Sequence, residues 1–577
     1  HLRAVLFSFL IKTDKEEDAD TMDEHTELSI ELMRKTIEQK DEQIQKLNET
    51  IEELRVTVAS LNETIEEFRR KFFGSSSERN RRKDPQAQEE VGPEEITVKS
   101  YKRQRKPKST RNELYKNLPV REVRCAMPED ERLCPDCDTP MATIAWQYVR
   151  EELSITPAKV ERIRYLREVL ACPVCREEDT GTIIKAPTPT ALLAHSPASP
   201  SMVAFVMYQK FMNAVPFYRQ EMDWLQMGAP LARETTAGWC IKCALAYFQP
   251  VYDLLHKYLC KREILHADET VCQVLHEKGK TAESRSYMWI YLSGNDGLAP
   301  IILYEYQPGR QGGYARDFLE GFHGLLSCDG YTGYNSVENV TLVCCLAHCR
   351  RYFFEAVPAA RRKKIKLLDI NSEEEIPEEA ADPERAIEKN KIPAEIGLSY
   401  CNRLFRTERR LKEMDAEERK EERLKQEVPI WEKFFAWLET IEPLKGSRLE
   451  KAVNYAVNHR DLLCNYLLDG RCEISNNRAE RRAKSYGTGR KNFLFHDTVK
   501  GAKSSAVIYS LVETAKANKL NVFQYLYTLL LYMPDYKDKP AGVEAMMPWS
   551  DFIKERCSGV MDVSTETPEN RGQIPLE

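Results

Sequence analysis

Hydrophobic residues recur with a seven-residue period between residues 30 and 72. Heptad position a is occupied by Ile30, Ile37, Ile44, Ile51, Val58, Ile65 and Phe72, and position d by Met33, Lys40, Leu47, Leu54, Leu61 and Phe68. β-Branched residues at a with leucine at d favour a parallel two-stranded coiled coil. The segment also repeats itself, because LNETIEEL (47–54) recurs as LNETIEEF (61–68). We therefore predict a homo-oligomer held by a coiled coil. The alternative is a long helix packed on its own chain.

Between residues 263 and 357 the pattern changes to the alternation and short apolar runs that are typical of β-strands. Strands are expected at EILHADETVCQVL, SYMWIYLSG and APIILYEYQP. A helix at YARDFLEGF, a strand at GLLSCDGY, a short helix and a strand at TLVCCLAH follow. Three strands, a helix, a strand, a helix and a strand is the order of an RNase H-like fold. In such folds carboxylates of the first and fourth strands lie side by side.

Three acidic residues fit one metal-dependent site: Asp268 in HADET, Asp329 in SCDGYTGYN and Glu473 in DGRCEISNN. Carboxylates are hard oxygen ligands suited to Mg²⁺ or Mn²⁺. Two such ions about 3.5–4 Å apart can activate a water or a 3′-hydroxyl and stabilise the leaving oxygen of a phosphodiester. We predict that these three residues are the metal ligands and catalytic carboxylates. Glu480 is the alternative to Glu473, and Glu269 is expected to point to the other face of its strand.

Two CxxC pairs suggest a structural zinc site. Cys134-Pro-Asp-Cys137 and Cys172-Pro-Val-Cys175 are separated by 34 residues, many of which alternate like strands. Four thiolates in two such pairs fit tetrahedral Zn²⁺. Cys240 and Cys243 repeat the spacing in an apolar helical context, where two buried thiols are the favoured interpretation.

A further group of possible ligands comprises Cys344, Cys345, His348 and Cys349. These residues follow a strand without a second ligand pair, so the sequence does not favour a metal site there.

Residues 200–262 read as helices, and part of this region resembles a helix-turn-helix. Trp224 and Leu225 lie on the first helix and Gly228 at the turn, and the second helix is expected to begin near Leu231 and to carry Arg233. A second helix after such a turn can enter the major groove of DNA. A helical hairpin packed into the core is the alternative.

The net charge of −6 does not indicate a nucleic-acid-binding protein, but the charge is segregated along the chain. Residues 14–27 and 373–384 are mostly acidic, whereas residues 101–111 carry six basic residues and no acidic one. Local basic patches determine where a phosphate backbone docks. The predicted DNA contacts are Arg103, Arg105, Lys106, Arg233, Arg350, Arg351, Arg478, Arg481, Arg490 and Lys491.

The 577 residues exceed the size of one domain, and the 42% of apolar residues suffice for real cores. Seventeen cysteines, an odd number, argue for a reducing compartment rather than a disulfide framework. The apolar stretch Val5 to Ile11 is too short to span a bilayer. These features predict a protein of a reducing cytosol with no membrane role.

The chain resembles the transposases of the insertion sequence 66 family, in the group that uses an Asp-Asp-Glu triad. The matching segments span most of residues 68–550: FGSSSER, both CxxC pairs, PFYRQE, HADET, YMWIY, CDGYTGYN, CLAHCRRYFFE, EISNNRAERRAK, GTGRKNFLF, YSLVETAKANKLN and AMMPW. The resemblance implies a triad at Asp268, Asp329 and Glu473, zinc on the four cysteines, a helical insertion before the last acid, and accessory proteins of the same element. Two small departures, CLAH for Cys-Trp-Ala-His and ISNN for Ile-Asp-Asn-Asn, leave the triad intact.

These patterns together predict a multidomain α/β protein, with an RNase H-like core split by a helical insertion. The expected units are a tail (1–24), a coiled coil (25–74), a basic linker (75–120), a zinc-binding domain (121–186), a helical DNA-binding region (187–262), the core (263–357 and 466–535), the insertion (358–465) and a second tail (536–577). Within the insertion, RTERRLKEMDAEERKEERLKQE is expected to form a solvated mixed-charge helix, either as a spacer or as a platform near the site.

The predicted function is cleavage of DNA at transposon ends and joining of the 3′-hydroxyl to target DNA. The alternatives are a structure-specific nuclease of the same fold and a DNA-binding protein that has lost catalysis.

Overall fold

The computed structural model describes residues 35–43, 45, 160–166, 168–171, 183–185, 188–362, 365 and 376–574. Residues 35–43 are helical, in agreement with the heptad pattern, but most of the predicted coiled coil lies outside these ranges. The same holds for the four cysteines of the predicted zinc site and for Arg103, Arg105 and Lys106. Within the described part of the chain, no helix is long and apolar enough to cross a membrane.

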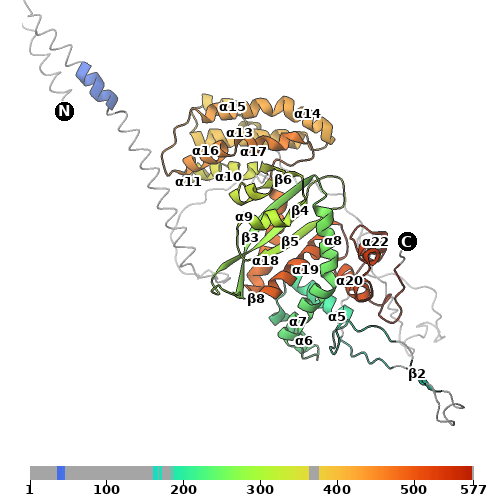
Figure 1. Ribbon diagram of the computed structural model, residues 1–577. Helices are drawn as coiled ribbons and strands as arrows, with labels where there is room; N and C mark the ends of the chain where they lie inside the picture. Colours follow the sequence, from blue (N-terminus) through green and yellow to red (C-terminus); the bar gives the residue numbers. More distant parts are fainter. Residues whose placement is uncertain are drawn as a thin grey trace, which may run out of the picture.

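A mixed six-stranded sheet forms the centre of the described structure (Figure 1). Its strands are β3 (Ile264–His276), β4 (Arg285–Ser293), β5 (Ile302–Gln307), β6 (Gly324–Cys328), β7 (Val340–Cys344) and the short β8 (His496–Thr498). The order across the sheet is β5-β4-β3-β6-β7, and β8 pairs with the far end of β3. β4 runs antiparallel to both β3 and β5, whereas β6 runs parallel to β3 and β7 parallel to β6. The five long strands lie where the sequence predicted them. β8, which comes from the other side of the insertion, was not foreseen.

A separate two-stranded hairpin, β1 (Val169–Ala171) with β2 (Ile183–Lys185), lies within the predicted zinc-binding region.

Helices before, between and after the strands share one core with the sheet. They are α5 (Pro200–Met207), α6 (Phe217–Gln226), α7 (Arg233–Cys243), α8 (Gln249–Leu259), α9 (Gly312–Phe318), α18 (Asn477–Phe493), α19 (Val499–Ala517), α20 (Val522–Tyr536), α21 (Pro540–Ala545) and α22 (Asp551–Cys557). The two helices expected of a helix-turn-helix are present as α6 and α7. Gly228 lies in the turn between them with φ +78°, a backbone conformation that suits glycine.

The edge strand β5 is covered by α19 through hydrogen bonds to its backbone. The amide N–H of Ile302 donates to Thr514 Oγ1 (3.0 Å), and that of Tyr304 donates to Ser510 Oγ (2.7 Å). An uncovered edge strand would leave these groups open to pairing with another chain. Side chains from α19 therefore close this edge of the sheet.

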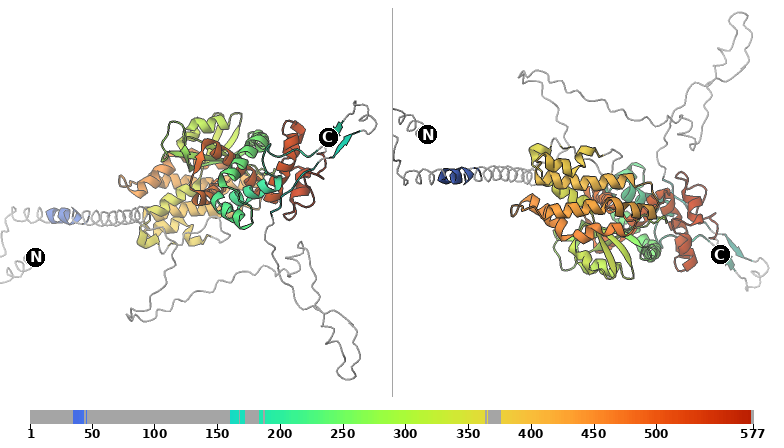
Figure 2. Two further views of the ribbon diagram at one scale, coloured as in Figure 1. Left: turned by 90° about the horizontal axis from the view of Figure 1, so that it is seen from below. Right: turned by 90° about the horizontal axis from the view of Figure 1, so that it is seen from above.

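The insertion folds into a second core, which also includes β7 and α10 (Leu346–Ala356). Its helices are α11 (Ala359–Arg362), α12 (Pro383–Glu388), α13 (Pro393–Arg410), α14 (Ala416–Gln426), α15 (Val428–Leu438), α16 (Arg448–Asn458) and α17 (Arg460–Cys464). Both views in Figure 2 show these yellow and orange helices grouped at the end of the molecule opposite to α20 and α22.

The mixed-charge segment of the insertion is not the single solvated helix that the sequence predicted. The chain leaves α13 at Arg410 and starts α14 at Ala416, with the Asp415 side chain accepting a hydrogen bond from the Glu418 amide. An acidic cap of this kind favours a new helix start. Arg423 of α14 is buried rather than solvated.

Candidate active site

Adjacent parallel strands bring the first two predicted carboxylates together. His266 of β3 is in register with Ser327 of β6. Continuing this register by two residues places Asp268 beside Asp329, which directly follows β6. Side chains two residues apart on a strand point to the same face. Both carboxylates therefore lie on the face of the sheet occupied by His266 and Ser327.

Burial and neighbouring negative charge raise the pKa of Asp268 to about 8, with burial as the largest cause. Glu269, Asp329 and Glu480 add to the shift because each places a like charge near this carboxyl. Such a carboxyl gains stability from a nearby cation, because a cation offsets this repulsion. The site thus has the electrostatic character of a metal-binding site.

Glu269, the neighbour of Asp268 on β3, is held by two partners. Tyr334 Oη donates to Glu269 Oε2 (2.6 Å) and Arg310 Nε donates to Oε1 (2.6 Å), while only 1% of the Glu269 side chain is exposed. Arg310 also lies 3.8 Å from Asp329 Oδ2, which is beyond hydrogen-bonding distance. Arg310, which lies beside Asp329, is thus bound chiefly to Glu269.

Asn476, immediately before α18, fixes this helix against the sheet. Its side-chain amide donates to the Ala267 carbonyl (2.7 Å), and its Oδ1 lies 3.1 Å from His266 Nδ1. Its backbone N–H donates to Cys345 Sγ (3.1 Å). These contacts tie the start of α18 to β3 and to the start of α10. Sequence patterns alone did not predict this role.

The two candidates for the third acid occupy different surroundings. Glu480 lies in the first turns of α18, and its charge acts on both Asp268 and His348. His348 in turn feels the charge of Asp329. Glu473 precedes α18, lies 3.4 Å from Arg478, and acts on buried His266. The arrangement therefore groups Glu480 with the two aspartates.

The helical insertion contacts the candidate site directly. Tyr455 of α16 donates its hydroxyl hydrogen to the Asp329 carbonyl (3.1 Å), and His459 Nε2 lies 3.3 Å from the Gly330 carbonyl. Gly330 has φ +84°, and a Cβ there would come within 3.1 Å of His459 Nε2. The insertion thus packs directly against the turn that carries Asp329.

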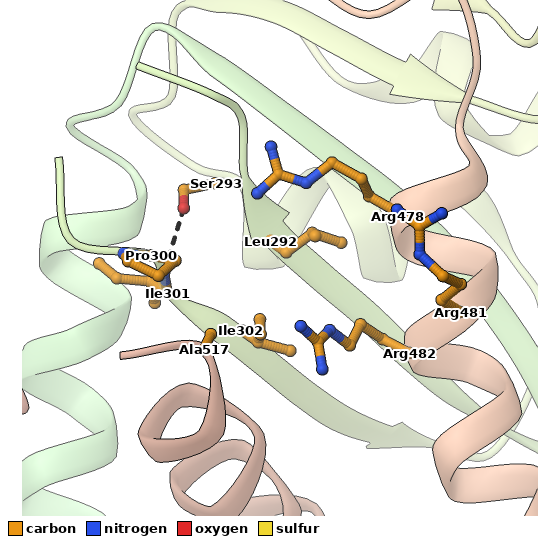
Figure 3. Close-up of a pocket in the computed structure, with 9 residues that line it drawn as sticks. All are labelled: Leu292, Ser293, Pro300, Ile301, Ile302, Arg478, Arg481, Arg482 and Ala517. Carbon is orange, nitrogen blue, oxygen red and sulfur yellow. Dashed lines mark hydrogen bonds between the residues drawn. The ribbon is translucent and has the colours of Figure 1, made fainter. Parts of the chain in front are cut away.

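Three arginines of α18 line a hollow at the ends of β4 and β5 (Figure 3). These are Arg478, Arg481 and Arg482, and Leu292, Ser293 and Pro300 to Ile302 form the opposite wall. Arg482 is bound to Glu513 (2.6 Å), and Arg478 lies near Glu473. The hollow brings several guanidinium groups together, an arrangement suited to phosphate oxygens.

One predicted DNA contact is wrong. Arg350 is only 4% exposed and donates to Asn402 Oδ1 (2.7 Å) between α10 and α13. It lies on the same helical face as Leu346 and Phe353, which are both buried. That spacing of four and three residues could have identified Arg350 as an inward position.

The other predicted contacts keep exposed positions or have their own partners. Arg351 is 48% exposed beside Glu480, and Arg233 is 54% exposed at the start of α7. Lys491 is exposed, whereas Arg490 donates to the Val271 carbonyl of β3.

The cysteine predictions have mixed outcomes. Cys240 and Cys243 are buried free thiols, as predicted. Cys345 and His348, for which the sequence showed no second ligand pair, lie with Glu480. One potential ligand atom of each residue lies within 4.8 Å of the other two. Glu480 is a further potential ligand that the linear spacing could not reveal.

Comparison with known families gives four matches along the chain. The model described as "Transposase IS66 family" matches residues 195–504, which is more than half of the sequence. The chain belongs to the IS66 transposase family. Models described as "zinc-finger binding domain of transposase IS66", "Transposase C of IS166 homeodomain" and "IS66 C-terminal element" match residues 131–176, 60–123 and 510–549. The zinc-finger match contains all four predicted zinc ligands.

Two relatives of this IS66 transposase are described as "Uncharacterized protein". The proteins y4hP and y4jD of Sinorhizobium fredii (strain NBRC 101917 / NGR234) are 26% and 27% identical to it over 455 and 452 residues. These alignments cover 74% and 76% of this chain and 77% and 81% of the relatives. Family membership identifies a transposase of an insertion sequence, with DNA as its partner and a zinc-finger domain.

Proposed function

We propose that this IS66 transposase cleaves DNA at the ends of its element and joins the 3′-hydroxyl to target DNA by two-metal chemistry. The ligands would be Asp268, Asp329 and Glu480, with Glu480 replacing Glu473 of the sequence prediction. The observation that carries this proposal is the pairing of Asp268 with Asp329 on neighbouring parallel strands, with the charge of Glu480 acting on Asp268.

The order of the strands supports an RNase H-like core. The first strand of the sheet, β3, lies in the middle. On one side of it is β4, antiparallel to β3, followed by β5, antiparallel to β4, and on the other side are β6 and β7, both parallel to β3. The segments before and after the insertion share one core. An RNase H-like domain that is split by the helical insertion accounts for both features.

The donor set fits hard divalent cations. Carboxylate oxygens are the ligands that Mg²⁺ and Mn²⁺ prefer, and the carboxyl of Asp268 lies among like charges that a cation would offset. When bound, two such ions supply activation of the attacking oxygen and stabilisation of the leaving oxygen. Asn476 holds the start of α18 so that Glu480 faces β3, and Tyr455 holds the backbone of Asp329.

DNA would approach along α18, which is rich in basic residues. Arg478, Arg481 and Lys491 lie on that helix, and Arg351 lies beside Glu480. Arginine and lysine contacts to phosphates position the duplex without reading its sequence. Arg233 at the exposed start of α7 is placed to contact DNA if α6 and α7 act as a helix-turn-helix. Zinc on the four cysteines and self-association through the coiled coil would complete end recognition.

The test is an end-cleavage and joining assay with purified full-length protein, a labelled element-end duplex and Mg²⁺. Wild type is compared with Asp329→Ala, Glu480→Gln and Glu473→Gln. We expect DNA binding by all four proteins and loss of both reactions in Asp329→Ala and Glu480→Gln alone.

Other outcomes would change the proposal in defined ways. Loss of activity in Glu473→Gln with retention in Glu480→Gln would restore Glu473 as the third ligand. Cleavage without joined products would favour a nuclease. Binding without chemistry in wild type, even with the accessory proteins of the element, would favour a DNA-binding protein that has lost catalysis.

A further inference from the structure

Three side chains with different donor atoms meet beside the proposed carboxylate site. Cys345 directly precedes α10, His348 lies one turn further on, and Glu480 approaches from α18. One potential ligand atom from each residue lies within 4.8 Å of the other two. Cysteine sulfur, imidazole nitrogen and a carboxylate oxygen form a mixed donor set that suits Zn²⁺ better than Mg²⁺.

The spacing of His348 and Glu480 fits an ion between them better than a direct contact. Nδ1 of His348 lies 3.7 Å from Oε1 of Glu480. Two ligands about 2.0–2.2 Å from one tetrahedral Zn²⁺ lie about 3.3–3.6 Å apart, so small adjustments would accommodate the ion. Within the described residues, both atoms are buried and have no hydrogen-bond partner. Unpaired buried polar atoms are uncommon in folded proteins. A metal ion bound between these two atoms would explain why they lack partners.

The surroundings hold the three ligands in place and leave access to them. The Asn476 N–H donates to Cys345 Sγ (3.1 Å), and Leu346 N–H donates to the Ile474 carbonyl (3.1 Å), which joins the two supporting elements. Hydrogen bonds to a ligand atom are typical outer-shell supports of metal sites. The side chains of His348 and Glu480 are 16% and 18% exposed, so an ion can enter from solvent.

We propose that Cys345, His348 and Glu480 bind a transition-metal ion of the Zn²⁺ type, at a site separate from the four-cysteine zinc finger. Binding releases the Cys345 thiol proton to solvent and leaves a fourth coordination position open. This site goes beyond the proposed Mg²⁺ chemistry. A regulatory consequence rests on the proposed function. Glu480 would be a ligand at both sites, so Zn²⁺ bound here withdraws a ligand from the catalytic ions.

The binding test uses full-length protein and Co²⁺ as a spectroscopic substitute for Zn²⁺. We expect Cys345→Ser and His348→Gln each to bind one equivalent of Co²⁺ less per chain than wild type. Serine keeps an acceptor for the Asn476 N–H but is a poor metal ligand. Cys344→Ser is the matched control, because this adjacent buried thiol faces Cys328 and should leave the Co²⁺ stoichiometry unchanged.

Thermal unfolding of the metal-free proteins checks that each variant folds, and His348→Gln provides a second variant on the more exposed side of the site. Equal Co²⁺ stoichiometry and spectra in wild type, Cys345→Ser and His348→Gln would overturn the proposed site. This readout needs no DNA, so its failure is distinguishable from failure of the transposition chemistry.

The consequence is tested separately by adding micromolar Zn²⁺ to the Mg²⁺-dependent cleavage assay. We expect inhibition of wild type and of Cys344→Ser, and at least a tenfold higher inhibitory concentration for Cys345→Ser. Equal inhibition of all three proteins would overturn competition through Glu480.

Discussion

The insertion and the candidate site each contain buried charge, but they balance it differently. In the insertion, Arg423 is 1% exposed and uses all five of its N–H groups. It binds both oxygens of Glu408 (2.6 and 2.7 Å) and the carbonyls of Tyr466, Asp469 and Cys472.

At the candidate site, Asp268 lies with Asp329, Glu480 and Glu269, and the nearby Arg310 is bound chiefly to Glu269. A buried charge whose hydrogen bonds are complete stabilises one structure. A cluster of like charges that lacks its counter-ion costs stability until a cation binds. This difference separates a structural ion pair from a functional site more clearly than burial does.

The largest expected effect is on chemistry. Asp268→Asn should reduce joined product by about 10⁴-fold, or about 5 kcal/mol of transition-state stabilisation, because the amide is a weaker ligand than the carboxylate. Asp317→Asn is the matched control, since this acid is 68% exposed on α9 and should leave the rate unchanged. The measurement is a single-turnover joining assay. A loss of less than tenfold would remove Asp268 from the reacting centre.

In the insertion, removal of the buried charge of Arg423 should affect stability rather than chemistry. Arg423→Met should lower the free energy of unfolding by about 3–5 kcal/mol, because Glu408 and three carbonyls lose their donor inside the protein. Lys425→Met on the same helix is 63% exposed and should stay within about 0.5 kcal/mol of wild type. Urea denaturation monitored by circular dichroism would measure both. Similar values for the two variants would show that the Arg423 network contributes little.

The buried carboxyl of Asp268 should also make the stability of the protein depend on pH. The pKa of Asp268 is about 8 in the folded chain, against 3.8 for an ordinary aspartate. Between these values the folded state binds more protons than the unfolded state, so the contribution of Asp268 to stability is lost as the pH rises towards 8.

Unfolding of metal-free protein at pH 5, 6, 7 and 8 should therefore show a smaller decline in Asp268→Asn than in wild type. Mg²⁺ should restore wild-type stability most at pH 8. Parallel curves for the two proteins would show that the carboxyl titrates as an ordinary exposed one.

The smallest expected effect lies where the two regions meet. Tyr455→Phe removes the hydroxyl that binds the Asp329 carbonyl but keeps the ring contact with Tyr352. We expect a loss of about 1 kcal/mol in unfolding free energy and a higher Mg²⁺ requirement for cleavage. A Mg²⁺ titration of the cleavage rate measures the second effect. An unchanged titration would mean that the insertion supports the fold without tuning the site.

Much of the sheet could be predicted from the sequence because strand alternation is local. The runs around Asp268 and Asp329 have the length, composition and order of strands, and the structure places strands there. The parallel register of β3 with β6 follows from that order.

The features that the sequence could not predict depend on contacts between residues far apart in the chain. Glu473 and Glu480 both lie close to the start of α18, and the packing of Asn476 against Ala267 and Cys345 determines how each faces the sheet. Arg423 looked solvated because its acceptors come from distant segments. Arg350 and Arg351 are equivalent in a charge count, yet one is buried and the other exposed.

The cover on strand β5 has a consequence for how the protein is made. The hydroxyl groups that satisfy this edge, on Ser510 and Thr514, lie 206 and 212 positions further along the chain than their partners. During synthesis the strand therefore leaves the ribosome long before its cover does. Open strand edges favour aggregation. A frameshift or nonsense mutation within the insertion would thus leave an aggregation-prone fragment rather than a smaller enzyme. Truncated copies of the element would therefore burden the chaperones and proteases of their host.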